Sequence, residues 1–190
     1  MNRSSLRRQY TYPLLIMAVI LFALAGVALL NGNATAAAEG TTVSLEVPQG
    51  AAPGDLIEVK LVADNAENLG GFQAAVHYDP AQLRLTGAQL PEQLGTSGRD
   101  LLALGPVFRS DSVVIGAASC PVQNCSEVLQ GRVQQEAAGV NGHVELATFT
   151  FYVEQPGQYL LQLQGVKLVD PQGATLSQSS LDAVLDVSGQ

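Results

Sequence analysis

The stretch from Gly70 to Pro80 constrains the fold of this chain most strongly, because it alternates with a period of two and then ends in an Asp-Pro turn. Successive side chains of a β-strand point to opposite faces, so this pattern predicts one core-facing and one outward-facing row. The positions expected to face a core are Phe72, Ala74, Val76 and Tyr78. The positions expected on the opposite face are Gln73, Ala75, His77 and Asp79. Pro80 cannot donate a backbone hydrogen bond, so the strand is predicted to end there.

Similar short alternating segments recur along the chain, separated by Gly, Pro and Asn, and no long segment shows the 3.6-residue period of a helix. Such a pattern is typical of a β-sandwich or barrel. The strongest segment spans residues 143–153 and shows a possible register change at Ala147. The expected strands are residues 43–47, 56–62, 71–78, 82–85, 112–119, 143–153, 158–164, 166–169 and 181–187.

The segments between these strands give weaker signals. Residues 64–68 and 93–100 are expected to be loops, and residues 101–104 fit either a short strand or one helical turn. Residues 126–141 fit either a long loop or a short helix that Ser126 would cap. The acidic segment 64–68 lacks the spacing and glycine of an EF-hand, so a solvated loop is favoured over a calcium site.

The first 38 residues have the pattern of an export segment, in which three arginines precede an apolar run of 17 residues, 14–30. Ala36 and Ala38 fit the small-residue rule for signal-peptide cleavage. The run is also long enough to remain as a membrane anchor. Cleavage after Ala38 and a retained N-terminal anchor therefore both stay open, and either places the rest of the chain outside the membrane.

Charge limits the partners of the exported part. Without residues 1–38 the chain keeps six basic and 17 acidic side chains, which give a formal charge of −11. A field of that sign disfavours nucleic acid, so no nucleic-acid partner is expected. The remaining length of about 150 residues suits a single domain with its own core.

Cys120 and Cys125 enclose four residues, and both lie in the exported part, where thiols are oxidised. They are predicted to form a local disulfide that fixes the shape of its loop. Two cysteines are too few for a structural zinc site, and His77 and His143 are distant in sequence. No metal or cofactor is expected. The chain contains no nucleophile elbow, phosphate-binding loop or metalloprotease motif, so no catalytic residue is predicted.

The order of several motifs resembles that of the cohesin domain family over residues 41–188. These motifs are Gly70-Gly71-Phe72, Tyr78-Asp79-Pro80 with Leu83, the segment 142–151, Gly157, and Val166-Lys167-Leu168-Val169-Asp170. The resemblance implies an all-β, jelly-roll β-sandwich of about nine strands that belongs to the superfamily of carbohydrate-binding-module-like sandwiches. It also implies a non-catalytic binding face on the sheet that contains residues 71–78. Carried over to this sequence, that face comprises Gln73, Ala75, His77, Leu160, Gln162 and Gln164.

Cohesins are best known for binding dockerins in cellulosomes. The resemblance therefore implies a secreted or membrane-tethered module for protein–protein assembly at the cell surface, with a dockerin-like or other surface protein as its partner. The position six residues before Asp79, which is often acidic in dockerin-binding cohesins, is Gln73 here.

Two other functions remain open, a carbohydrate-binding module and a structural envelope protein. Sugar rings are usually gripped by exposed aromatic side chains. The chain has no Trp, and most of its Tyr and Phe residues lie at predicted core positions. Phe108, in a predicted loop, is the candidate contact for a glycan.

Overall fold

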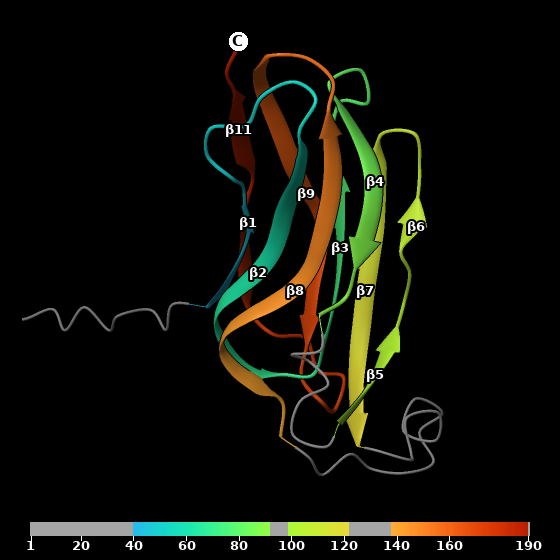
Figure 1. Ribbon diagram of the computed structural model, residues 1–190. Helices are drawn as coiled ribbons and strands as arrows, with labels where there is room; N and C mark the ends of the chain where they lie inside the picture. The colour runs from blue at the N-terminus through green and yellow to red at the C-terminus, as the bar shows by residue number, and fades with distance from the viewer. Residues whose placement is uncertain (1–39, 92–98, 122–137, 190) are drawn as a thin grey trace, which may run out of the picture. The chain divides into compact units, whose positions relative to one another are not determined.

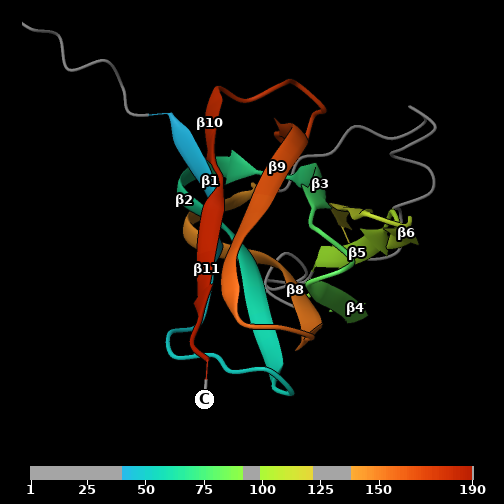
Figure 2. The same ribbon diagram turned by 90° about the horizontal axis from the view of Figure 1, so that it is seen from above.

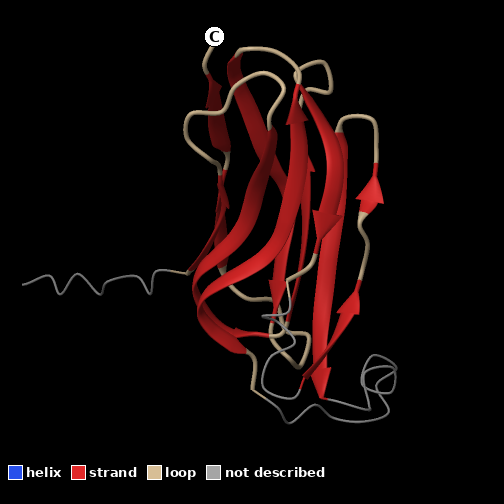
Figure 3. Ribbon diagram, viewed as in Figure 1, coloured by secondary structure: helices blue, strands red, loops and turns tan. Residues whose placement is uncertain are grey.

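The computed structural model describes residues 40–91, 99–121 and 138–189. Every regular element in these ranges is a β-strand (Figure 3). Within the same ranges, no helix is long and apolar enough to cross a membrane. The strands are β1 Thr41–Glu46, β2 Leu56–Leu69, β3 Gly71–His77, β4 Leu83–Gln89, β5 Arg99–Ala103, β6 Val107–Phe108, β7 Ser112–Pro121, β8 Val140–Val153, β9 Gly157–Val169, β10 Gln178–Leu181 and β11 Ala183–Val187.

These strands form two sheets that pack face to face (Figures 1 and 2). The first sheet has five strands in the order β10-β1-β2-β8-β4, and the second has six, in the order β11-β9-β3-β7-β5 with β6 paired to β7. Neighbouring strands are antiparallel except β1 and β10, which run parallel. The predicted all-β, jelly-roll β-sandwich is confirmed.

The core is built from the inward-facing rows of both sheets. On β3, Phe72, Ala74 and Val76 are buried as the alternation predicted, while Tyr78 is partly buried and packs against the same core. On β8, Phe149 and Phe151 are fully buried. All described members of this core lie within the compact unit Glu39–Gln190.

Register shifts in β8 and in β9 interrupt the alternation, and beyond each shift the buried side chains fall on residues of the opposite parity. In β8, Leu146 and Ala147 are both buried, because the pairing with β2 shifts there by one residue. The register change predicted at Ala147 is thus confirmed. In β9, Gly165 has a φ of +57° and lies where the pairing with β3 also shifts. A glycine in this left-handed conformation is typical of a bulge.

The predicted loop at residues 64–68 is wrong, because β2 continues through it to Leu69. Ala66 and Leu69 are buried and hold the segment against the core. The continuation is irregular, since Asn65 and Asn68 have φ values of +54° and +53°. The polar composition that suggested a loop therefore reflects a bulged strand end that is anchored by two apolar residues.

Three other boundaries also differ from the sequence-based expectation. The segment 181–187, expected as one strand, is divided between β10 and β11, which belong to different sheets. Residues 158–164 and 166–169 form the single strand β9, because Gly165 bends the chain without ending the ladder. Arg99 and Asp100 belong to β5 rather than to a loop, and residues 101–103 continue this strand. Pairing with β7 decides that choice in favour of a strand over a helical turn. Most of the segment 126–141 lies outside the described residues.

Candidate partner-binding face

The outer face of the six-stranded sheet brings the predicted site residues together. Ala75 of β3 lies opposite Gln164 of β9, and His77 lies opposite Gln162. Directly opposed residues in a sheet share a face, so the two rows form one surface. We call this surface the glutamine face. It comprises Gln73, Ala75, His77, Leu160, Gln162 and Gln164. Its role in binding stays a prediction.

The exposed side chains of this face are polar or apolar but uncharged. Gln73, Gln162 and Gln164 are exposed, while Ala75 and His77 are half-buried. Leu160, near the start of β9, is 51% exposed. It adds apolar area to the face that contact with another molecule would cover.

Neighbouring strands extend this surface with small or aliphatic residues that sequence reasoning missed. On β7, Gly116 lies opposite Gln73 and Val114 lies opposite Ala75. On β11, Val184 lies opposite Leu160 and is 52% exposed. Strand alternation alone could have found Val184, but only the register shows that it adjoins Leu160.

The outer face of the other sheet has a different character. The ion pairs in the described part of the chain are Lys60–Glu145, Arg84–Glu154 and His143–Asp64, with N···O distances of 3.0, 2.9 and 2.7 Å. All of them involve β2, β4, β8 or the residue after β8. Interface cores are depleted in charged residues, so the glutamine face is the better candidate for docking.

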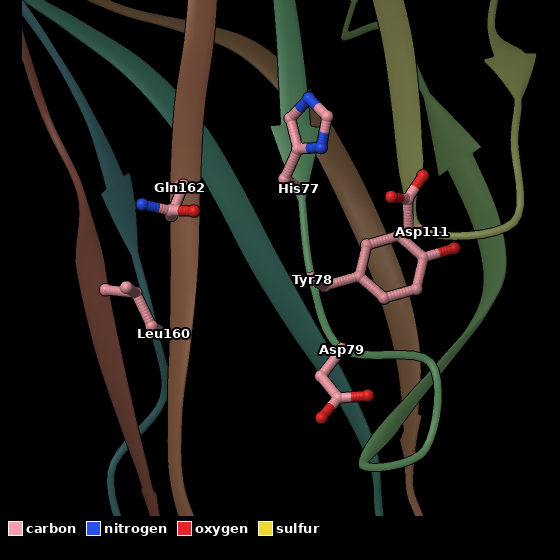
Figure 4. Close-up of a pocket in the computed structure, with 6 residues that line it drawn as sticks. All are labelled: His77, Tyr78, Asp79, Asp111, Leu160 and Gln162. Atoms are coloured by element: carbon pink, nitrogen blue, oxygen red, sulfur yellow. The ribbon is translucent and has the colours of Figure 1, made fainter.

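An open hollow of about 290 Å³ lies at one end of the glutamine face. Its lining residues are His77, Tyr78, Asp79, Asp111, Leu160 and Gln162. Figure 4 shows Leu160 and Gln162 on β9, His77 to Asp79 at the end of β3, and Asp111 beyond the Tyr78 ring. The hollow therefore joins the aliphatic part of the face to two carboxylates.

Tyr78 fixes one wall of this hollow. Its ring meets the buried Phe151 ring edge-on, with centroids 5.1 Å apart. Its backbone NH donates to the Asp111 carbonyl at 3.0 Å. Burial raises the pKa of the Tyr78 hydroxyl, and the Asp111 carboxylate raises it further. The phenol thus stays protonated at neutral pH.

Asp79 belongs to the turn that follows β3. Its Oδ1 accepts a hydrogen bond from the Ala81 NH at 2.9 Å, and its carbonyl accepts from the Leu83 NH at 2.9 Å. The Asp-Pro turn predicted from sequence is confirmed. It also brings the Asp79 carboxylate to the edge of the glutamine face, on the side where the alternation had placed it.

The candidate glycan contact, Phe108, is 57% exposed on the short strand β6. It lies opposite Val113, a core residue of β7, so it does not share the glutamine face. Leu104 and Val107 nearby are 53% and 54% exposed. The exposure expected of Phe108 is confirmed, and its contact with a glycan stays a prediction.

The remaining candidates do not assemble into a reactive centre in the described part of the chain. Cys120 is buried at the end of β7, whereas Cys125 lies outside the described residues, so their disulfide stays a prediction. His143 is on the other sheet from His77 and contacts Asp64. Among the described residues, no group of three or more His, Cys, Asp or Glu side chains is placed to hold a metal ion.

No protein-family model matches the chain, and neither does any curated protein. Solved structures do match. A type I cohesin–dockerin complex from Clostridium thermocellum, Coh-OlpC–Doc435, contains a chain that aligns with a TM-score of 0.61 and 10% identity, over 80% of this chain and 96% of the other. This chain has the cohesin fold.

Two further cohesins show the same likeness. A non-cellulosomal cohesin from the archaeon Archaeoglobus fulgidus aligns with a TM-score of 0.57 and 17% identity, over 78% of this chain and 91% of its own. The second type II cohesin module of the ScaA scaffoldin from Acetivibrio cellulolyticus gives the same TM-score and identity, over 76% of this chain and 88% of its own. The cohesin-like fold that the motifs predicted is therefore confirmed, while identities this low leave the function open.

Proposed function

We propose that this cohesin-like domain is a non-catalytic extracellular module that mediates protein–protein assembly at the cell surface. The observation that carries the proposal is the glutamine face, a row of uncharged side chains on β3 and β9 that includes an exposed leucine and has a single lysine, Lys167, beside Gln73. The fold supports the same reading, since the Clostridium thermocellum neighbour is a cohesin in complex with a dockerin. The predicted export segment supports the extracellular location.

Binding at this face would rest on area and hydrogen bonds rather than on charge. Each glutamine amide offers two donors and an acceptor. Val114, Val184 and Leu160 add apolar area around them. Such a mixture matches the composition of protein interfaces, in which charged residues are depleted at the centre.

Gln73 influences which hydrogen-bonding groups a partner protein can present to the glutamine face. It lies opposite Gly116 on one side and Lys167 on the other. An amide at this position can donate as well as accept, whereas the acid often found in dockerin-binding cohesins can only accept when it is ionised. We propose a dockerin-like or other surface protein whose contact groups differ from those that an acidic residue would select.

The test is a binding experiment with residues 39–190 as bait against the extracellular proteins of the source organism. For a recovered partner, Gln73→Arg and Gln164→Arg should each weaken binding about tenfold, because they place a long charged side chain within the interface. Gln89→Arg is the matched control, since Gln89 is exposed on β4 of the other sheet. Unchanged affinity in both face variants would move the binding site elsewhere.

Polysaccharide binding is the second candidate, because Phe108 is the one exposed aromatic ring in the described ranges and has two exposed aliphatic neighbours. A polysaccharide panel run against the same domain tests it. Tight binding of a glycan that Phe108→Ala abolishes would replace the protein-assembly proposal.

A further inference from the structure

We infer that the hollow at the end of β3 receives a basic side chain of the partner protein, arginine in preference to lysine. The inference rests on the proposed function, because it specifies the chemistry of one contact at the glutamine face. It starts from two carboxylates, Asp79 and Asp111, which reach the same hollow from different segments of the chain. The lining contains no lysine or arginine that would neutralise them.

Both carboxylates are oriented by local hydrogen bonds but keep the capacity to accept more. The Asp79 Oδ1 accepts from the Ala81 NH at 2.9 Å, and the Asp111 Oδ1 accepts from the Ser112 hydroxyl at 3.2 Å. Among the described residues, each carboxylate accepts these side-chain hydrogen bonds on Oδ1, and both aspartates are exposed to solvent. An incoming cation would meet pre-oriented acceptors. A guanidinium suits them better than an ammonium, because its planar fork can donate to two oxygens at once.

The side of the hollow that β9 provides suits the apolar stem of such a side chain. Leu160, which is 51% exposed, and Gln162 line the hollow there. Arginine side chains bury their methylene stems along apolar surface while the charged head stays at the rim. The volume of about 290 Å³ is just below the range for sites of drug-sized ligands, so a single side chain is the fitting occupant.

The same arrangement would discriminate between partners. A protein that covered the hollow with an apolar side chain would take two carboxylates out of water without compensation, which is unfavourable. The hollow would therefore act as a specificity element, while the glutamine face supplies the contact area.

The test is an NMR titration of ¹⁵N-labelled residues 39–190 with two probes, N-acetyl-arginine amide and the neutral N-acetyl-citrulline amide. The arginine probe should shift the amide signals of Tyr78, Asp79 and Asp111, and its affinity should exceed that of citrulline by at least about threefold. Added salt should reduce the difference in affinity between the two probes, because the ion pair between the guanidinium and the carboxylates is exposed to solvent. Equal affinity for the two probes, or shifts only at other residues, would overturn the inference.

Asp79→Asn and Asp111→Asn test the carboxylates one at a time. Asparagine keeps the Oδ1 acceptor that each local hydrogen bond uses, so the fold should be retained while the charge is lost. Each variant should weaken arginine binding about threefold. Asp170→Asn is the matched control, because its carboxylate also accepts a turn NH but lies outside the hollow. If either test variant kept full arginine binding, its carboxylate would have no part in the site.

The failure of this inference can be told apart from the failure of the proposed function. Gln73→Arg should weaken the protein partner but leave the arginine titration unchanged, since Gln73 does not line the hollow. A partner whose binding is weakened by Gln73→Arg but unchanged by both aspartate substitutions would refute the proposed arginine contact. The proposed role in protein assembly would then be retained.

Discussion

Gly70→Ala should destabilise the domain strongly, although it adds only one methyl group. Gly70 is buried between β2 and β3, where the chain passes from one sheet to the other. Its NH donates to the Val169 carbonyl at 2.8 Å, and its own carbonyl accepts from the Ser119 NH at 2.8 Å. A Cβ at this position would stand 2.5 Å from the Asp170 carbonyl carbon and 2.6 Å from the Pro171 Cα.

The clash is with backbone atoms, which cannot rotate away as a side chain does. Relief requires β3 to move away from the turn after β9, and that movement would strain the hydrogen bonds that Gly70 makes to Val169 and Ser119. Overpacking of a tight interior costs about 1 to 3 kcal/mol, and the backbone contact places this case near the upper end, at about 3 kcal/mol. For a domain of this size, that corresponds to a fall of about 6 to 12 °C in Tm.

The assay is urea and thermal unfolding of residues 39–190, followed by far-UV circular dichroism, since the chain has no Trp for fluorescence. Gly87→Ala is the matched control, because a Cβ there would meet Thr150 side-chain atoms at 3.6 and 3.7 Å, which is ordinary contact. That variant should be neutral or slightly stabilising, since alanine restricts the unfolded chain. Equal midpoints for the two variants would refute the close-approach reasoning.

Three other changes test the packing, a turn and one exposed ion pair. Phe151→Ala should cost about 3 to 5 kcal/mol in urea unfolding, because it empties a fully buried site and removes the ring that Tyr78 contacts. Asp170→Ala should cost about 1 kcal/mol and Asp170→Asn much less, since only alanine removes the acceptor for the turn NH groups of residues 172 and 174. The hydrogen bond to Asp64 raises the pKa of His143, so the stability it adds should be full below the ordinary pKa of histidine and lost as the pH rises through the raised value. Tm measured against pH should show this small step in the wild type and not in Asp64→Ala; a step that persists in the variant would assign it to another group.

Period-two alternation was sufficient to predict most of the fold. In β3 every residue expected in the core is at least partly buried, because a strand with one solvent-exposed face allows only one register of its apolar residues. The failures lie where the alternation breaks. Residues 64–68 were predicted to be a loop because they are mostly polar. The left-handed conformations of Asn65 and Asn68 let Ala66 and Leu69 face the core, and no local sequence pattern indicates this.

The candidate site was predictable only in part, for a related reason. Gln73, Ala75 and His77 follow from one strand, and Gln162 and Gln164 follow from another. Their registration side by side depends on the bulge at Gly165, which shifts β9 by one residue against β3. Asp111 enters the hollow from the turn before β7, and no local sequence pattern connects it with Asp79.

Gly165 also links the core to the surface. Before the bulge, the odd-numbered residues Tyr159, Leu161 and Leu163 are buried, and after it the even-numbered Leu168 is buried. The one-residue shift leaves Gln164 and Gly165 exposed in succession, so the strand keeps its core contacts on both sides of the break. Without the extra residue, either Leu168 or Leu163 would turn outward, because side chains alternate strictly. The bulge thus allows β9 to pack along its whole length while it aligns Gln164 with Ala75 and Gln162 with His77.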